Sequence, residues 1–336
     1  MNSPISISTP STTEMLVALD AGLHRSVDRL KATHNGLWDM ATYAMGWSGE
    51  GAGPETTGKR IRPLLCLLSC GGCGADWRAA LPPAGAVELI HSFSLIHDDI
   101  QDGDATRRGR PTVWKRHGSA QAINLGDAIF TLAFSVLVDS DSSIAAEWLR
   151  ILSGTCLRLT YGQFLDLTYE DAQRITLGEY QEMIEGKTAA LVEAACRLGA
   201  VSAGAAHERQ DAFARFGRAL GLAFQIQDDF LGVWGDPKVT GKPNASDLLA
   251  RKKSLPILYG LERSEKFRTL LADGPTPAVI PSLLAELEAC GAREHTLMLS
   301  RHWVDQAFES LDAAKPLGEF NPALEALARA LLDRQK

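Results

Sequence analysis

Apolar residues recur three or four positions apart through most of this chain, and Ala and Leu dominate these stretches. That spacing places apolar side chains on one face of a helix, whereas the alternation of apolar and polar residues that marks a strand is scarce. The pattern predicts helices over residues 16–32, 60–71, 83–102, 119–138, 143–168, 176–202, 207–232, 247–263, 281–289, 294–312 and 321–334. We therefore expect an all-α fold.

Short segments rich in Gly, Pro and Asp separate the predicted helices. They cover residues 46–57, 71–76, 103–111, 235–244 and 273–277. None of them is long enough to be an interdomain linker, and no repeat of about 30–45 residues is present. With 336 residues, 45% of them hydrophobic, the chain can bury a large core. We expect one domain over residues 16–336, in which helices surround a central active-site cavity, after a disordered segment over residues 1–15.

Composition excludes several classes of function. The formal net charge of -7 gives no support for nucleic-acid binding. No run of about 18 apolar residues is free of polar interruption, and the N-terminus lacks the pattern of a signal peptide, so no membrane span is expected. Cys66, Cys70 and Cys73 lie close together, but no second Cys/His pair completes a zinc site. We expect reduced thiols in a cytoplasmic protein.

The first of two aspartate-rich segments ends an apolar run and reads Leu-Ile-His-Asp-Asp-Ile-Gln-Asp over residues 95–102. Asp98 and Asp102 are one helical turn apart, so both carboxylates can reach the same hard cations. Mg²⁺ prefers a few carboxylates together with substrate phosphate oxygens. Three arginines follow within residues 107–110 and are suited to phosphate. A solvated acidic turn is the alternative, but polar groups clustered beside apolar surface usually mark a functional site.

A basic segment, Thr-Gly-Lys-Arg-Ile-Arg-Pro over residues 57–63, leads into the next predicted helix. Backbone N–H groups at a helix start favour an anion, so this segment suits a phosphate. It is not a P-loop, because Arg60 replaces the required Ser/Thr and no strand precedes it.

These segments resemble the trans-isoprenyl diphosphate synthase (polyprenyl synthetase) family, and the resemblance covers most of the chain after residue 58. The first segment matches the family's DDxxD motif and the RRGRPT that follows it. Residues 57–63 match GGKRxRP, with Thr57 in place of the first glycine. Residues 161–167 resemble its GQxxDL segment, and residues 186–191 resemble its KT segment. The resemblance implies a head-to-tail prenyltransferase that condenses isopentenyl diphosphate with an allylic diphosphate.

The resemblance also implies a role for each matched residue. It assigns three Mg²⁺ ions to Asp98, Asp102, Asp166 and Asp228. It assigns isopentenyl diphosphate to Lys59, Arg62, His91 and Arg108. It assigns the allylic diphosphate to Arg107, Lys187, Gln225, Lys242 and Lys252. The implied catalytic set is Asp98, Asp99, Asp102, Arg107, Lys187, Thr188, Asp228 and Lys242.

The second aspartate-rich segment departs from the family pattern. It reads Gln-Asp-Asp-Phe-Leu-Gly over residues 227–232, so Gly232 stands where the family has a third aspartate. Because one carboxylate is lost, we interpret the segment as a variant of an active site with altered metal binding. Residues 235–256 are Gly/Pro-rich and then basic, which predicts a mobile loop that closes over diphosphate. The spacing within this loop leaves the role of Asp247 open.

Product length in the resembled family depends on residues just before the first motif. Phe93 is the fifth residue before Asp98 and is bulky. Ser94 lies one helical turn before Asp98 and is small, so it leaves space there. In the family this combination accompanies short to medium products, so we expect geranylgeranyl diphosphate (C20). Farnesyl diphosphate (C15) and longer products are the alternatives, and a phenylalanine on a buried helix is also common core packing.

Two other classes of protein share part of this pattern. A class I terpene cyclase shares the helical cavity and a DDxxD motif, but it should also carry an (N/D)DxxSxxxE motif, which this sequence lacks. A catalytically silent partner subunit is expected to lose the first aspartate motif, which this sequence keeps. Function is argued from such sites and not from the fold. By analogy with the family, a homodimer is expected.

Overall fold

The computed structural model of the chain describes residues 12–170, 172, 174–236 and 245–332. Regular structure in these ranges is helical except for one hairpin of two short strands, β1 (Thr106–Arg107) and β2 (Arg110–Pro111). The all-α prediction is therefore confirmed. Two compact units are distinguished by their internal contacts.

Unit 1 contains the described residues up to 153, together with 194–210 and 315–324. Its helices and 3-10 turn are α1 (Thr12–Thr33), α2 (Asn35–Ala44), α3 (Pro54–Thr57), α4 (Ile61–Gly72), η1 (Trp77–Ala80), α5 (Leu81–Gln101), α6 (Val113–His117) and α7 (Ser119–Val138). Unit 2 contains residues 154–193, 211–314 and those from 325 onward.

Unit 2 is also helical. Four helices have residues in both units, namely α8 (Ala145–Glu170), α10 (Ala190–Ser202), α11 (His207–Trp234) and α18 (Phe320–Leu332). The others are α9 (Leu177–Ile184), the π turn η2 (Glu185–Ala189), α13 (Ser246–Leu249), α14 (Leu255–Arg263), α15 (Glu265–Ala272), α16 (Ile280–Ala289) and α17 (Ala292–Ala314).

In unit 1, α1 buries one apolar stripe. Met15, Leu19, Leu23 and Val27 recur at every fourth position, and each is at most 1% exposed. This spacing keeps the four side chains on one helix face, which packs into the core. The described helix begins at Thr12, so residues 12–15, which were expected to be disordered, are helical, and residues 1–11 lie outside the described residues.

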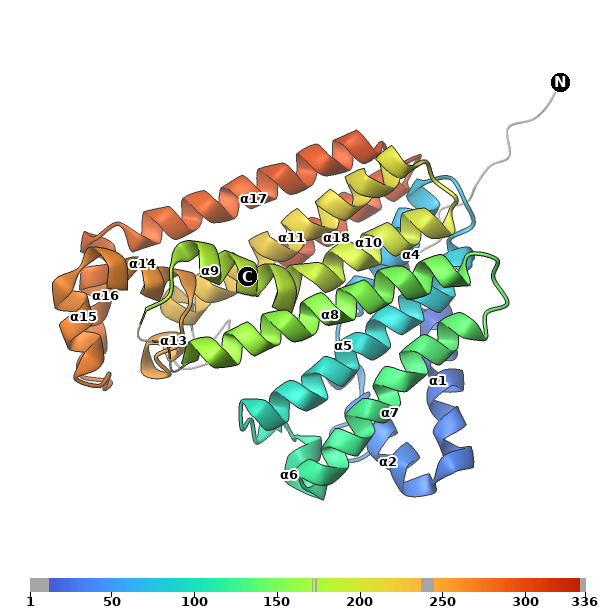
Figure 1. Cartoon of the computed structure of the whole chain (residues 1–336), viewed down its shortest axis with the longest axis horizontal. Helices are drawn as coiled ribbons and strands as arrows, with labels where there is room; N and C mark the ends of the chain where they lie inside the picture. The colour runs from blue at the N-terminus through green and yellow to red at the C-terminus, as the bar shows by residue number, and fades with distance from the viewer. Residues whose placement is uncertain (1–11, 171, 173, 237–244, 333–336) are drawn as a thin grey trace. The chain divides into compact units, whose positions relative to one another are not determined.

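Helices α5 and α7 run side by side in unit 1 (Figure 1). Their close approach depends on Gly126 of α7, where an added Cβ would lie 2.1 Å from Nε2 of His97 on α5. Helix α5 starts at a Leu-Pro-Pro segment, because proline is tolerated in the first turn, where its missing N–H has no partner. It ends before Gly103, which adopts φ 69. This ending places the first aspartate motif on the last turn of the helix.

The hairpin that follows α5 turns at Arg108 and Gly109, both with positive φ (50 and 74). Two consecutive residues of this kind are typical of a tight I′ turn between antiparallel strands. Tyr43 of α2 anchors the second strand, because its hydroxyl donates to the carbonyl oxygen of Pro111 over 2.7 Å. The segment predicted as a loop over residues 103–111 is thus an ordered hairpin that presents Arg107 and Arg108.

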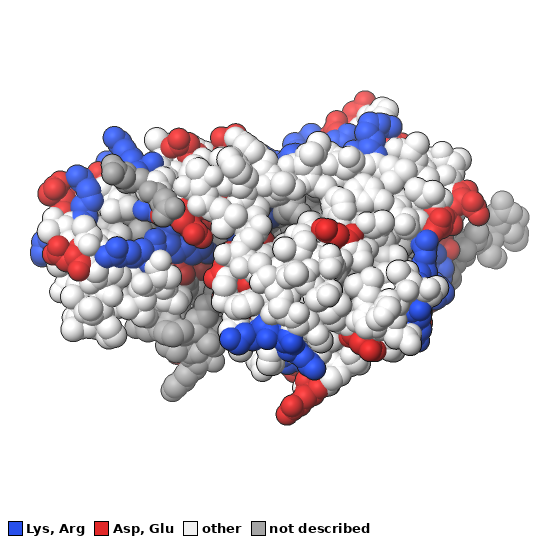
Figure 2. Space-filling model, turned by 60° about the horizontal axis from the view of Figure 1, so that its bottom comes forward, with Lys and Arg blue, Asp and Glu red and all other residues white. Residues whose placement is uncertain are grey.

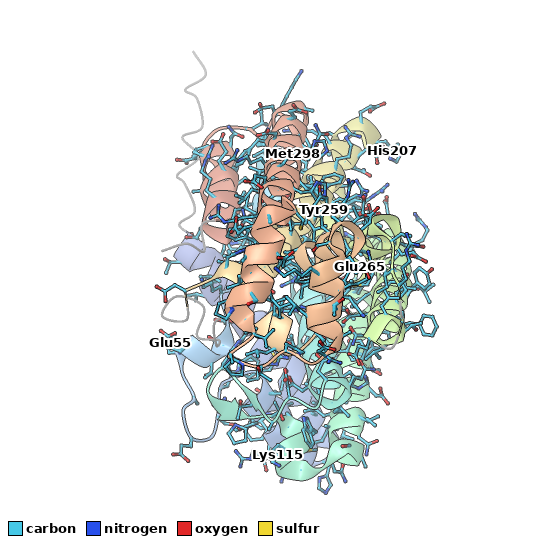
Figure 3. The ribbon with its side chains drawn as sticks, turned by 90° about the vertical axis from the view of Figure 1, so that its left-hand side faces the viewer. Glu55, Lys115, His207, Tyr259, Glu265 and Met298 are labelled. Carbon is cyan, nitrogen blue, oxygen red and sulfur yellow. The ribbon has the colours of Figure 1, made fainter. Side chains whose placement is uncertain are left out.

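In unit 2, helices α14 to α17 surround a second core. Val233, Leu248, Ile257, Phe267 and Leu283 are fully buried in it. At its edge, Tyr259 of α14, labelled in Figure 3, stacks on His295 of α17 with the ring centroids 4.3 Å apart. This core fixes the position of α13 and of the segment between α13 and α14.

Two predicted helices are interrupted. The helix expected over residues 176–202 widens into the π turn η2, and the helix expected over 247–263 breaks between Leu249 and Leu255. Pro256 explains the second break, because proline lacks the backbone N–H of a helix interior and is tolerated in the first turn, where α14 places it. Short helices α2, α6 and α15 were not predicted at all. The predicted loop over 235–244 lies mostly outside the described residues.

Two stretches, Trp77–Gln101 and Ser119–Val138, are long and apolar enough to cross a membrane by length and composition alone. Core helices meet the same criterion, and 56% and 39% of the two windows are buried, so the test by itself identifies no span. Charged residues on the face drawn in Figure 2 form small separate groups with uncharged surface between them. That distribution differs from the broad basic surface typical of a nucleic-acid-binding protein.

Candidate active site

The first aspartate motif lies in unit 1, at the end of α5. Asp98 is half-buried in the last turn, and Asp102 is the exposed C-cap residue, whose N–H donates to the carbonyl oxygen of Asp98 over 2.8 Å. The two carboxylates therefore follow one another along the helix by one turn, as their spacing predicted. Oxygen donors of this kind at a helix end are suited to a hard divalent cation.

Asp99 lies between them in the sequence, and its side chain is buried. It accepts a hydrogen bond of 2.5 Å from Nε of Arg107 on β1. Burial raises the pKa of Asp99, and Arg107 opposes that rise. The sequence grouped Asp99 with the catalytic residues, which stays a prediction, and the structure shows its carboxylate paired with the Arg107 guanidinium.

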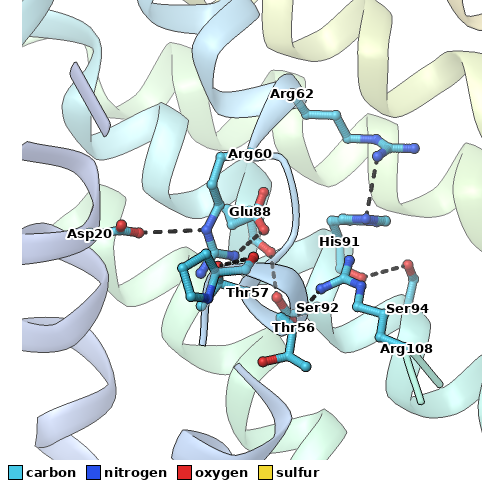
Figure 4. Close-up of polar contacts among 11 residues, drawn as sticks. Asp20, Thr56, Thr57, Arg60, Arg62, Glu88, His91, Ser92, Ser94 and Arg108 are labelled. Atoms are coloured by element: carbon cyan, nitrogen blue, oxygen red, sulfur yellow. Dashed lines mark hydrogen bonds and ion pairs between the residues drawn. The ribbon is translucent and has the colours of Figure 1, made fainter. Parts of the chain in front are cut away.

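A pocket in unit 1 adjoins this motif. Its charged and ionisable lining comprises Arg60, Glu88, His91, Asp99, Arg107, Arg108 and Arg110. Nη1 of Arg62 lies 3.3 Å from Nε2 of His91 (Figure 4). Burial holds the pKa of His91 well below its usual value, and Arg62 and Arg108 lower it further. The pocket is therefore cationic and contains a neutral imidazole, which favours an anionic ligand.

Arg108 points back to the segment before α4. Its Nη1 donates to the carbonyl oxygen of Thr56 over 2.6 Å, and burial lowers its pKa. Arg62, His91 and Arg108, predicted to bind isopentenyl diphosphate, are thus brought together in unit 1. Lys59, the fourth, is exposed and makes no hydrogen bond or ion pair with other described residues.

Two buried residues that line the pocket, Arg60 and Glu88, were not predicted as functional residues. Arg60 has a left-handed backbone (φ 49) and forms an ion pair with Glu88 of α5, and both side chains are nearly inaccessible. Nε of Arg60 also lies 3.5 Å from a carboxylate oxygen of Asp20. The signal that could have found this pair is the single acidic residue within the apolar run of residues 83–90. The pair fixes the segment that carries Lys59 and Arg62.

The KT segment lies in unit 2, on the π turn η2. A Cβ on Gly162 of α8 would lie 2.1 Å from the backbone nitrogen of Lys187, and one on Gly221 of α11 would lie 2.7 Å from Cα of Ala189. Two glycines therefore let α8 and α11 approach η2 closely. Lys187 forms an ion pair with Asp166 of α8.

Thr188, next along η2, is linked to the second aspartate motif through Gln225 of α11. Its hydroxyl donates to Oε1 of Gln225 over 2.7 Å, and Nε2 of Gln225 donates to Oδ1 of Asp229 over 3.0 Å. Oδ2 of Asp229 accepts from the Tyr180 hydroxyl (2.6 Å) and the Leu255 N–H (2.9 Å). Asp229 is only 2% exposed and its pKa is raised by burial. Like Asp99, it is buried and is hydrogen-bonded to neighbouring groups.

Asp228, before it, is half-buried, and Lys252 follows α13. Desolvation lowers the pKa of Lys252, but Asp229, Asp247 and Asp228 raise it more, so the net shift is upward. The ammonium is therefore held in its charged form by surrounding carboxylates. Lys242, also predicted to bind the allylic diphosphate, lies outside the described residues.

The fit of a metal ion depends on what completes its coordination. Within the described ranges, no group of three or more His, Cys, Asp or Glu side chains is arranged to hold a metal. The half-buried Asp98 with Asp102, and Asp228 by itself, provide carboxylate oxygens for a metal whose remaining ligands are water and phosphate oxygens. Asp166 is engaged by Lys187. The residues present thus fit a metal that is bound together with its substrate.

Comparison with known proteins decides which family has this arrangement. A family model described as polyprenyl synthetase matches residues 53–279, which includes both aspartate motifs and the KT segment. The chain belongs to the polyprenyl synthetase family. Members of this family use a divalent metal. The family resemblance drawn from the motifs is confirmed.

Relatives among the polyprenyl synthetases match over nearly the whole chain. A (2E,6E)-farnesyl diphosphate synthase of Mycobacterium tuberculosis is 40% identical, covering 88% of this chain and 86% of that protein. A geranylgeranyl diphosphate synthase of the same organism is 39% identical, covering 93% and 90%. A crystal structure of a polyprenyl synthetase from Streptomyces coelicolor A3(2) is 38% identical, with a TM-score of 0.86 and coverage of 94% and 97%. Nearly equal identity to enzymes with different products leaves chain length to be argued from the residues.

Proposed function

We propose that this polyprenyl synthetase condenses isopentenyl diphosphate with an allylic diphosphate, head to tail, and releases geranylgeranyl diphosphate. The observation that carries the proposal is the cationic pocket of unit 1 directly beside the first aspartate motif. A terpene cyclase needs one diphosphate site, and the Arg62–His91–Arg108 cluster provides for a second anion. A silent partner subunit would not need the Asp98 and Asp102 carboxylates.

The proposed reaction begins with the allylic diphosphate. Its C1–O bond breaks, and the electron pair leaves with the diphosphate. Arg107, Lys187 and Lys252, assigned to this diphosphate by the family pattern, offset the charge that builds on the leaving oxygen. The paired carboxylates keep Arg107 and Lys187 in place before substrate arrives, so little reorganisation is needed.

The allylic cation is then attacked at C1 by the double bond of isopentenyl diphosphate. Arg62, Arg108 and the neutral His91 hold that second diphosphate at a fixed distance from C1. A proton is lost from C2 of the isopentenyl unit, and the new double bond forms. The departed diphosphate is the proposed base, because the residues assigned to the site include no side chain suited to that proton.

Mg²⁺ is the proposed metal. When bound, it supplies positive charge to the diphosphate and screens the carboxylates from it. The family pattern assigns the donor oxygens to Asp98, Asp102, Asp166 and Asp228. Because these groups are hard oxygen donors, Mg²⁺ or Mn²⁺ is favoured over a soft metal.

Product length is proposed from the aromatic residues beside the motif. Phe93 of α5 contacts Phe130 of α7 with the ring centroids 4.9 Å apart, and Phe130 contacts Phe134 at 5.0 Å. An aromatic pair that spans α5 and α7 is harder to displace than one ring, which supports a fixed limit to chain growth. Ser94 leaves room next to it, which favours C20 over C15.

The proposal includes a homodimer that acts in the cytoplasm. Leu157, Tyr161 and Phe164 form an exposed apolar stripe along α8, at 72%, 47% and 61% exposure, and such a stripe suits a second copy of the chain. All six cysteines are free thiols, which is typical of a reducing compartment.

The test measures diphosphate release from an allylic diphosphate with and without isopentenyl diphosphate, in the presence of Mg²⁺. We expect release to require isopentenyl diphosphate, and Asp98→Ala to lower kcat/KM by at least about a thousandfold. Asp39→Ala, which changes an exposed carboxylate on α2, is the matched control and should keep full activity. Release without isopentenyl diphosphate, with a hydrocarbon product, would identify a cyclase instead.

A further inference from the structure

Gly232, the residue that replaces the third aspartate of the second motif, is in contact with another carboxylate. A Cβ built on Gly232 would lie 2.3 Å from both Cγ and Oδ2 of Asp247 and 2.5 Å from Oδ1. Real Cβ atoms do not approach other atoms this closely, so no side chain fits at position 232 while Asp247 stays in place. The Asp247 carboxylate therefore occupies the space that a side chain at 232 would need.

Asp247 is held there by its surroundings. It lies in the first turn of α13 and is 7% exposed. The hydroxyl of Ser246, the residue before it, is 3.5 Å from the carbonyl oxygen of Gly232. Helix α13 is thus in contact with α11 at the glycine, and Leu248 of α13 is fully buried in the adjoining core. A buried carboxylate is costly unless it has a charged or hydrogen-bonding partner.

Lys252 follows Asp247 at the end of the same turn. The carboxylates of Asp229, Asp247 and Asp228 raise the pKa of its side chain. Its backbone N–H also donates to the carbonyl oxygen of Asp247 over 2.9 Å, so the two residues are joined by the turn that ends α13. Asp229 also accepts hydrogen bonds from Tyr180, Gln225 and Leu255. Asp247 is a further buried carboxylate, which the backbone hydrogen bond joins to the Lys252 turn.

We propose that Asp247 replaces the missing third carboxylate of the second motif and acts as a positioning residue for Lys252, with Gly232 providing the space it requires. This inference rests on the proposed function, in which Lys252 binds the allylic diphosphate. The sequence alone presents Gly232 as a loss of charge. In the structure, an acidic side chain is still present at this place, but it is Asp247 of α13 and not a residue of α11.

The first test probes the contact between Gly232 and Asp247 by measuring stability and not activity. Gly232→Ala should lower the melting temperature by several degrees, because the new Cβ collides with Asp247. The same change in an Asp247→Ala background should cost much less, so the two effects are not additive. Gly154→Ala, at a helical glycine with open space around it, is the control and should not lower the melting temperature. If the two substitutions lowered the melting temperature additively, Asp247 would not occupy the space of a side chain at position 232, and the proposal would be contradicted.

The second test measures how the Asp247 carboxylate affects substrate binding by Lys252. Asp247→Asn keeps the shape of the side chain and removes its charge. We expect it to raise KM for the allylic diphosphate about tenfold and to change KM for isopentenyl diphosphate less than about twofold. In a Lys252→Ala background the same substitution should add no further rise. A rise in that background, or equal effects on both substrates, would show a general structural role and overturn the proposal.

Failure of the proposed function can be told apart from failure of this inference. If the wild-type enzyme does not consume isopentenyl diphosphate, the proposed function fails, and the Lys252 test is repeated by measuring the affinity for inorganic diphosphate with Mg²⁺. The positioning role predicts weaker binding by Asp247→Asn only when Lys252 is present. Unchanged affinity in Asp247→Asn, with a normal melting temperature, would contradict it.

Discussion

In each aspartate motif, two adjacent residues do different work. Asp99 and Asp229 are buried and are occupied by Arg107 and by Tyr180, Gln225 and Leu255, respectively. Asp98 and Asp228 are partly exposed beside them. Adjacent residues point about 100° apart on a helix, so one of each pair is directed at the core when the other is partly exposed. The sequence could not distinguish the two, because that choice depends on what packs against the helix.

His91 makes stability depend on pH in a definite direction. Its pKa lies well below 6.5 in the folded protein, because of burial and of Arg62 and Arg108. As pH falls below 6.5, the unfolded chain takes up a proton that the folded protein does not, so stability decreases toward the folded pKa. Above pH 6.5 the His91 imidazole is neutral in both the folded and the unfolded protein, so His91 no longer makes stability depend on pH.

We therefore expect His91→Gln to reduce the loss of unfolding free energy between about pH 7.5 and about pH 5.5, measured by urea denaturation. His117→Gln, at an exposed histidine at the end of α6, is the control and should leave the wild-type pH dependence in place. An identical dependence in His91→Gln and wild type would refute the assignment.

At the scale of elements, the π turn η2 is the feature that the sequence missed. Residues 176–202 keep helical spacing throughout, so nothing in their pattern marks a change of helix type. The turn is enforced from outside, by α8 at Gly162 and α11 at Gly221. Extra residues inside a helix often occur at functional sites, and here they carry Lys187 and Thr188. The break at Pro256 was readable in principle, because proline leaves a local signal.

Gly162→Ala should show that this close approach matters. Its Cβ would meet backbone atoms of η2, which cannot rotate away, so we expect the free energy of unfolding to fall by about 1–3 kcal/mol. Gly154→Ala lies on the same helix with nothing within 4 Å and should be neutral or stabilising by about 0.4–1 kcal/mol. Denaturant titration of both variants measures the difference, and equal effects would mean that η2 does not depend on the contact.

The contact between α5 and α7 predicts how product length responds to mutation. Phe93→Ala removes the ring that faces Phe130 and should lengthen the main product by at least one C5 unit, measured by mass spectrometry of the hydrolysed alcohols. Phe134→Ala, at the far end of the same aromatic row, is the control and should change the product less. An unchanged distribution in Phe93→Ala would remove Phe93 from the chain-length limit.

At the scale of the whole molecule, the sequence predicted the all-helical class and most of the long helices. Their apolar periodicity is local information, and it suffices for α1, α5, α7 and α11. The predicted isopentenyl diphosphate residues Arg62, His91 and Arg108 do lie together. The buried Arg60–Glu88 pair and the Gly232–Asp247 contact join residues distant in sequence, so only packing reveals them. The single-domain prediction for residues 16–336 stays a prediction.

The proposed homodimer predicts that a charge on the α8 stripe separates the copies. Phe164 is 61% exposed, and Phe164→Glu should shift the mass measured by light scattering from two chains toward one. Met298→Glu on α17, labelled in Figure 3, is the matched control because Met298 is 59% exposed. A wild-type protein that is already monomeric would contradict the dimer, and a Phe164→Glu dimer would place its interface elsewhere.

The most direct test of the central claim is the product formed by the purified protein. The protein is incubated with Mg²⁺, isopentenyl diphosphate and, separately, the C5, C10 and C15 allylic diphosphates, and product lengths are measured by mass spectrometry. The account predicts elongation of the allylic diphosphates to a dominant C20 product. A C15 product, or one of C25 and longer, would contradict the chain-length assignment. A hydrocarbon formed without isopentenyl diphosphate, or no product at all, would contradict the prenyltransferase itself.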